Sequence, residues 1–248
     1  MDYTSLIKSI PNDWKQEILQ EYTNRNQDQT KIYMYQHSHL TQMEKVCNKV
    51  YWYLIKNMLH QNKNNMQRWE EVFDITLENN VQEDIYRLPW HATLDTKLRT
   101  FQYKLLKRIL PTKIHLKKYN ITDNDLCSFC AIQPESYEHL FHHCPVSHAL
   151  QIRLVNWLSP QLMPVEPLSG KNVILGYTNI PCIKVTNLIN TIMMIYKYYI
   201  YKCKCKETPL NFGLLLKDIK QHFCIESNSQ NVSKRTKWEI LEHKLQNV

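Results

Sequence analysis

The residues best suited to chemistry lie between positions 127 and 144, where the chain reads CSFCAIQPESYEHLFHHC. Cys127 and Cys130 form a C-x2-C pair, a spacing that lets two thiolates reach one tetrahedral ion at about 2.3 Å. His139 and Cys144 follow as an H-x4-C pair. A lone C-x2-C pair is also typical of redox sites, but the complete pattern C-x2-C-x8-H-x4-C supplies four nitrogen and sulfur donors. It predicts a structural zinc site.

The spacing alone leaves the histidine ligand open. His139 and Cys144 are five residues apart, which is not one face of an ideal α-helix, so we expect the backbone between them to tighten or break. Pro145 supplies a reason, because a proline disfavours helical geometry at the residue before it. His148 is the alternative ligand, since it follows Cys144 by four residues and would share a helical face with it.

A strongly basic segment precedes the Cys/His cluster, and Asp95 is the only acid between positions 95 and 118. Charges of one sign repel unless an anion neutralises them, which favours a phosphate-binding surface with strong salt dependence. A solvated helix face is the alternative, and Tyr103 and Tyr119 could stack on unpaired bases or belong to the core. The candidate nucleic-acid-binding residues are Lys97, Arg99, Lys104, Lys107, Arg108, Lys113, Lys117 and Lys118.

A second basic segment, YKYYIYKCKCK, covers positions 196–206. Its lysines lie at the expected C-terminus of a helix, where cations suit the helix dipole. We expect that dipole role together with solvation. Contact with nucleic acid and attachment to a membrane surface are the alternatives.

The elements that must position these residues are predicted to be helices, with few or no strands, so the expected fold is all-α with a small zinc-stabilised Cys-Cys-His-Cys knuckle. A basic helix should run from Asp95 to Leu110 and end at Pro111. Val173–Leu175 is the one expected short strand, in a connector rich in proline and glycine. Further helices are expected at Asn12–Tyr22, Thr41–Leu59, Met66–Thr76, Pro145–Leu158, Thr186–Cys203, Asn211–His222 and Lys234–Leu245.

Composition narrows the function classes. The chain has 31 Lys and Arg against 23 Asp and Glu, a net charge of +8 that favours an anionic partner. Three glycines are too few for a P-loop or dinucleotide fingerprint. There is neither an Asp-Asp pair for a polymerase palm nor an HExxH motif, so we expect no catalytic activity and no small-molecule substrate. The most apolar run, Ile189–Ile200, is too short to span a bilayer, so we expect an intracellular protein, nuclear or cytoplasmic, with reduced cysteines and no membrane partner.

The stretch from Leu94 to Leu150 resembles the zinc-binding region that follows the reverse transcriptase of non-LTR (LINE-type) retrotransposons. The resemblance is carried by KLRTFQYKLLKRILPT with its proline, by the CSFC knuckle, and by HLFHHCP; NVILGY and LINTIMMIYKYYIYKCK also look like the tail of such proteins. It implies that the zinc ligands are Cys127, Cys130, His139 and Cys144. Gln151 departs from the pattern, because relatives often have a tryptophan near it, which puts the local packing in doubt.

The resemblance implies three segments: residues 1–90 as a thumb-like or linker helical segment, 91–158 as the basic helix with the zinc-binding region, and 159–248 as a helical tail. It also implies a non-catalytic C-terminal portion that grips template RNA or target DNA beside an upstream reverse transcriptase domain. Two other readings stay open. The chain could be a zinc-stabilised helical module for protein–protein interaction, or a non-functional retrotransposon remnant.

Overall fold

The computed structural model describes residues 65–159, 162, 169–178 and 180–247. In this part of the chain the elements are helices, and β-pairing is limited to one isolated bridge between Leu126 and Pro134. The expected all-α class with a metal-binding knuckle is therefore confirmed there. The helices expected at Asn12–Tyr22 and Thr41–Leu59 lie outside the described residues.

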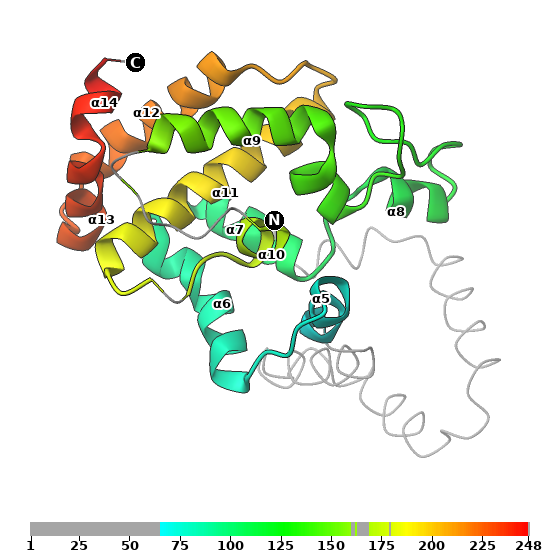
Figure 1. The fold of residues 1–248 in the computed structure, drawn as a ribbon, viewed down its shortest axis with the longest axis horizontal. Coiled ribbons are helices and arrows are strands. Elements are labelled where there is room, and N and C mark those ends of the chain that lie inside the picture. Colours follow the sequence, from blue (N-terminus) through cyan, green and yellow to red (C-terminus); the bar gives the residue numbers. More distant parts are fainter. Residues whose placement is uncertain (1–64, 160–161, 163–168, 179, 248) are drawn as a thin grey trace, which may run out of the picture. The chain divides into compact units, whose positions relative to one another are not determined.

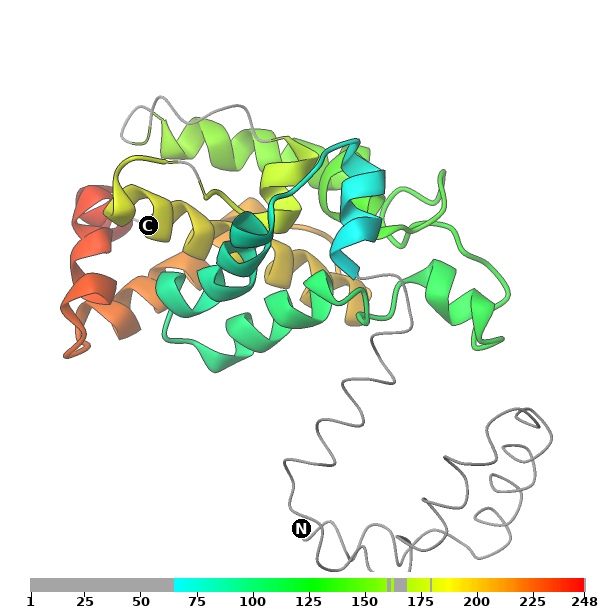
Figure 2. The same ribbon diagram turned by 90° about the horizontal axis from the view of Figure 1, so that it is seen from below.

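Helix α11, Ile183–Cys205, forms the centre of the fold. It is apolar almost all round, and a helix of that kind must be covered by its neighbours. It packs against α6 (Asn79–Ala92), α7 (Thr96–Leu106) and α12 (Phe212–Ser227). Figures 1 and 2 show α11 between α9 (Pro145–Leu158) on one side and the α6–α7 pair on the other.

Shorter elements complete the arrangement. In Figure 1, α8 and the knuckle loop lie at one end of α11, and α13 and α14 lie toward the other. These elements are α5 (Asn65–Phe73), α8 (Lys113–Lys118), the π-helix η2 (His139–His143), α10 (Gly170–Leu175), α13 (Val232–Thr236), the 3-10 helix η3 (Lys237–Ile240) and α14 (Glu242–Gln246).

Several sequence-based predictions need correction. Val173–Leu175 is the end of helix α10 and not a strand, because the Ser169 side chain accepts a hydrogen bond from the Asn172 amide and begins a helical turn. The predicted helix at Lys234–Leu245 is divided among α13, η3 and α14. Helix α6, which carries Pro89 in its last turn, was not predicted at all.

The basic helix is shorter than predicted. Its start is as expected, since the Asp95 side chain accepts from the amides of Lys97 and Leu98 and caps α7. It ends at Leu106, well before Pro111. Arg108 lies at φ 55, in the left-handed region, and the Ile109 amide donates to the Lys104 carbonyl oxygen at 3.0 Å. This is a Schellman end with arginine where glycine is usual.

A buried carboxylate fixes the connection between α6 and α7. Glu226 Oε1 accepts from the Thr93 hydroxyl at 2.6 Å and from the Leu94 amide at 2.8 Å, and its Oε2 pairs with Lys237 Nζ at 2.6 Å. Burial alone would raise the pKa of Glu226, but the Lys237 ammonium and these hydrogen bonds bring it below its usual value. Glu226, on α12, therefore fixes the turn between α6 and α7 although it lies far from that turn in the sequence.

All described residues belong to one compact unit, Lys63–Val248. Elements from both sides of residues 90 and 158 pack around α11, and the three-segment division stays a prediction. Among the described helices, none combines the length and the apolar character needed to cross a bilayer.

Candidate metal centre

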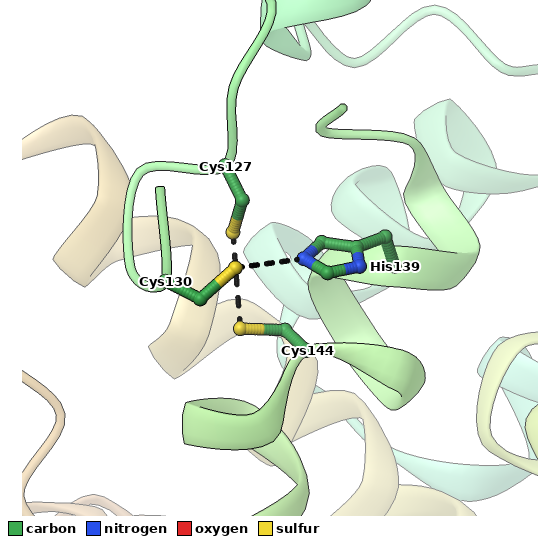
Figure 3. A group of neighbouring side chains, drawn as sticks. All are labelled: Cys127, Cys130, His139 and Cys144. Atoms are coloured by element: carbon green, nitrogen blue, oxygen red, sulfur yellow. Dashed lines mark hydrogen bonds between the residues drawn. The ribbon is translucent and has the colours of Figure 1, made fainter. Parts of the chain in front are cut away.

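Four side chains from the Cys/His cluster converge on one point. The Sγ atoms of Cys127, Cys130 and Cys144 and one ring nitrogen of His139 all lie within 4.8 Å of one another. Cys127 Sγ and Cys144 Sγ are 3.8 Å apart, and Cys130 Sγ lies 3.3 Å from His139 Nε2. Figure 3 shows the three sulfurs and the ring directed toward a shared centre. This group could hold a metal ion.

The distances fit a tetrahedral ion better than a disulfide. Four donors at about 2.3 Å from a centre are separated along each tetrahedral edge by about 3.8 Å. The two sulfurs of Cys127 and Cys144 have that separation, whereas a disulfide would bring them to about 2.05 Å. The three sulfur donors and one nitrogen donor are also the types that a structural zinc site uses. The residues present therefore fit zinc.

A small hairpin positions the first two cysteines. The Cys127 amide donates to the Gln133 carbonyl oxygen at 2.8 Å, and the Glu135 amide donates to that of Asp125 at 2.7 Å. Between these bonds the Ala131 amide donates back to the Cys127 carbonyl oxygen, and Ala131 adopts φ 53. This tight turn brings the Cys130 thiol back beside that of Cys127.

A wide helical turn positions the other two donors. Residues His139–His143 form a π-helix, in which the Cys144 amide donates to the His139 carbonyl oxygen at 2.7 Å. The backbone does not tighten here, because the turn widens, and i to i+5 is the spacing a π-turn closes. Helical geometry does break at Cys144, as expected. Cys144 itself is extended (φ −62, ψ 126), as the following proline predicts, and α9 begins at Pro145.

The competing histidine lies outside this group. His148 is exposed on the first turns of α9, and its ring contacts that of His142 at a centroid distance of 6.1 Å. Gln151, the departure from the family pattern, is buried, and its Oε1 lies 3.2 Å from His142 Nδ1. The structure brings His139 and not His148 to the three cysteines, and the assignment of ligands stays a prediction.

The electrostatics of the Cys127–Cys144 pair favour one thiolate and one thiol, because the hydrogen bond between the two sulfurs, together with burial, raises the pKa of Cys127. The pKa of Cys144 is lowered, first by the hydrogen bond from the Cys127 thiol and further by the amides of Ser147 and Val146 at the start of α9. A thiolate is the form that binds metal. Zinc held by these four residues would have no open position for water, so the ion would supply structural strength and no reaction.

The two acids near the site do not contact the free nitrogen of His139, which has no hydrogen-bond partner among the described residues. Glu138 instead pairs with Arg108 at 3.3 Å. Glu135 is fully buried, and its Oε2 accepts from the Ser128 amide at 2.9 Å. Glu135 Oε1 accepts from the Lys113 amide at 2.9 Å and lies 3.1 Å from Lys204 Nζ. Glu135 thus ties the knuckle to the start of α8 and to the end of α11.

The structure separates the predicted basic residues into two groups. Arg108 packs over the rings of Trp69 (4.3 Å) and Tyr137 (5.2 Å), so its role is structural. Lys117 is exposed but lies 3.2 Å from Asp125 Oδ1. The members with exposed side chains are Lys97, Lys104, Lys117 and Lys118, and the half-buried ones are Arg99, Lys107, Arg108 and Lys113.

The second basic segment is mostly structural as well. Lys204 is buried and donates to the Pro111 carbonyl oxygen, and Lys197 is buried with its Nζ 2.6 Å from Gln102 Oε1. Lys202 pairs with Asp218 at 2.6 Å. Lys206 is the exposed lysine of this segment.

Sequence reasoning missed two aromatic residues beside the basic helix. The Arg99 guanidinium lies 4.6 Å from the ring centroid of Trp90, and Lys107 Nζ lies 4.8 Å from that of Tyr86. The signal was present, since Tyr86 and Trp90 are four residues apart and share a helical face. It depended on recognising α6 as a helix.

Comparison with known proteins supports the metal-binding interpretation. A family model described as zinc-binding in reverse transcriptase matches residues 68–150, about a third of the chain, and this match includes all four converging residues. Searches of curated proteins and of solved structures found no match. The chain therefore contains a region similar to a zinc-binding domain of reverse transcriptases. Because this domain is an accessory one, the match is consistent with a non-catalytic role.

Proposed function

We propose that this protein is a non-catalytic, nucleic-acid-binding portion of a LINE-type retrotransposon reverse transcriptase protein, from the C-terminal side of its polymerase. The observation that carries the proposal is the convergence of Cys127, Cys130, His139 and Cys144 within the matched region. Zinc would lock the knuckle beside the basic segment, and its binding energy would be part of the folding energy of that segment. The upstream reverse transcriptase domain would supply the chemistry, in the nucleus or cytoplasm.

Exposed lysines supply the grip on RNA or DNA. Lys97 and Lys104 on α7 and Lys118 on α8 have exposed side chains, and no carboxylate pairs with any of them among the described residues. Lysines of this kind neutralise phosphates and release counterions, which gives affinity that depends on salt and little on sequence.

Protein docking is the second candidate function, favoured by apolar side chains around the knuckle. Ile109, Ile121 and Ile132 are 59%, 69% and 72% exposed. Apolar side chains gathered on one part of a surface are typical of interaction sites. Under this alternative, reversing the exposed lysine charges would leave partner binding intact.

The proposal is tested by zinc analysis and by binding of labelled RNA and single-stranded DNA over a range of salt. We expect about one zinc per chain and affinity that falls steeply as salt rises. The double variant Lys104→Glu/Lys118→Glu should reduce the slope of log affinity against log salt by about 1.5, because two phosphate contacts are lost. Lys217→Glu, an exposed lysine on α12, is the matched control. Binding that does not change with salt would contradict the proposal.

A further inference from the structure

Two rows of side chains face each other across the α6–α7 pair. Tyr86 and Trp90 are four residues apart on α6, and Arg99, Tyr103 and Lys107 follow at the same spacing along α7 and its C-cap. Residues four apart lie on one face of a helix, and α6 packs against α7, so the two rows form one surface. We call these five residues the aromatic–cation ladder.

Cations and rings alternate along this ladder. Besides the Arg99–Trp90 pair, the ammonium of Lys107 lies between two rings, 4.8 Å from the centroid of Tyr86 and 5.9 Å from that of Tyr103. Each distance is within the range in which a cation attracts a ring face. The contacts favour these ring orientations before any ligand arrives, each by about 0.5–1 kcal/mol at an exposed site.

The ladder rests on a rigid base. Arg99 Nε donates to the Thr93 carbonyl oxygen at 2.8 Å, and the Thr93 hydroxyl donates to buried Glu226. The rings nevertheless stay open to solvent, since Trp90 is 63% exposed and Tyr103 is 52% exposed. Large exposed rings cost free energy in water, and here they are left uncovered.

We propose that the aromatic–cation ladder is a stacking platform for the unpaired bases of a single-stranded nucleic acid. The inference rests on the proposed function and deepens it by naming the form of nucleic acid that this surface takes. One ring face of Trp90 is covered by Arg99, and the exposed part of the side chain offers a flat surface to a base. Lys97 and Lys104 are exposed on a neighbouring face of α7 and would meet the phosphates of a strand that crosses the ladder.

Single strands fit this surface better than the other anionic partners. Bases inside a duplex stack on one another and present only their edges, so their faces cannot reach Trp90 or Tyr103. An acidic peptide could pair with the lysines but would leave the rings exposed. A single strand can contact both the rings and the cations of the ladder. Every unpaired base has a flat face that stacks on a ring, and every nucleotide carries a phosphate that a cation attracts.

The experiment compares two labelled oligonucleotides of equal length, a polyuridine strand and an abasic strand with the same number of phosphates, binding to the full zinc-loaded chain. We expect the strand with bases to bind at least about 5-fold more tightly, since stacking of one base on an aromatic side chain contributes that much or more. Trp90→Ala/Tyr103→Ala should remove this preference and leave the salt dependence unchanged. Trp90→Phe/Tyr103→Phe should keep most of it, and Ile152→Ala, an exposed apolar residue on α9, should keep all of it.

The outcomes separate this inference from the proposed function. Equal affinity of the wild-type chain for both strands, with strong salt dependence, would overturn the stacking platform and support the phosphate grip. Binding of neither strand would overturn both. A duplex or polyglutamate that binds as tightly as polyuridine would also overturn the platform. This last comparison uses only the wild-type chain, so it does not depend on whether a variant folds.

Discussion

His139 presents its Nε2 atom to the sulfurs of Cys127, Cys130 and Cys144, whereas His148 stays on the exposed face of α9. The choice between the two histidines is made by the backbone, because the π-turn brings His139 over the cysteine that ends it. Metal ligation through Nε2 would also explain why so polar a side chain is buried at that place.

Replacing the two histidines one at a time tests this assignment. His139→Ala removes one of four donors, so we expect zinc affinity to fall by more than about 100-fold. This loss is larger than the one caused by replacing a residue that only hydrogen-bonds to a metal ligand. His148→Ala should retain the zinc content and affinity of the wild type. Competition with a chromogenic chelator measures both. If His148→Ala loses its zinc and His139→Ala keeps it, the ligand set is wrong.

The donor types and their order along the chain could be read from the sequence, but their geometry could not. C-x2-C followed by H-x4-C is enough to predict the chemistry. The π-turn between His139 and Cys144 is rare, so spacing arguments based on an ideal helix left His139 and His148 as alternatives, and it is His139 that the structure brings to the cysteines. The role of Glu135 was also hidden, because its partners Lys113 and Lys204 come from distant parts of the chain.

Arg108 decides where the basic helix ends. A proline stop at Pro111 was the natural prediction, but the helix ends at Leu106 because the left-handed conformation of Arg108 lets its guanidinium lie over Trp69. Such long-range stacking leaves no local signal in a sequence. The prediction of α9 succeeded for the opposite reason, since Pro145 at its first position is a local signal.

Two variants at this position separate the cost of its conformation from the benefit of its contacts. Arg108→Ala loses the stacking on Trp69 and Tyr137 and the ion pair with Glu138, and it keeps the left-handed backbone. Arg108→Gly loses the same contacts but adopts that backbone freely. We expect both to unfold more easily than the wild type in urea, and Arg108→Gly to be more stable than Arg108→Ala by about 1 kcal/mol. If the alanine variant matches the glycine variant, the conformation imposes no strain.

The charge of the whole chain overstates the charge that it presents to a ligand. The net charge of +8 is counted over all lysines and arginines, yet several lie inside the fold. Among the residues that the structure describes, the buried lysines are Lys197, Lys204, Lys234 and Lys237. All four donate to backbone carbonyl oxygens, which belong to Ile174, Pro111, His91 and Ala92 respectively. The exposed positive charge near the knuckle is therefore carried by fewer residues than the sequence indicates.

The buried lysines should make the stability of the chain depend on pH above neutrality. Burial lowers the pKa of Lys197 to about 7 and that of Lys237 to about 8, whereas both keep ordinary, higher values when unfolded. Between pH 7 and 9 the unfolded state therefore binds more protons, and the free energy of unfolding rises with pH, by roughly 4 kcal/mol. Lys197→Met should lose about two thirds of this rise, because the buried ammonium that titrates is removed. The Ile174 carbonyl oxygen keeps Gln102 Nε2 as its donor, whereas Gln102 Oε1 loses its partner, which lowers the stability at both pH values alike. Urea unfolding of the zinc-loaded chain at both pH values measures it, with Lys104→Met as the exposed control. An undiminished rise in Lys197→Met would mean that Lys197 stays protonated in the folded chain.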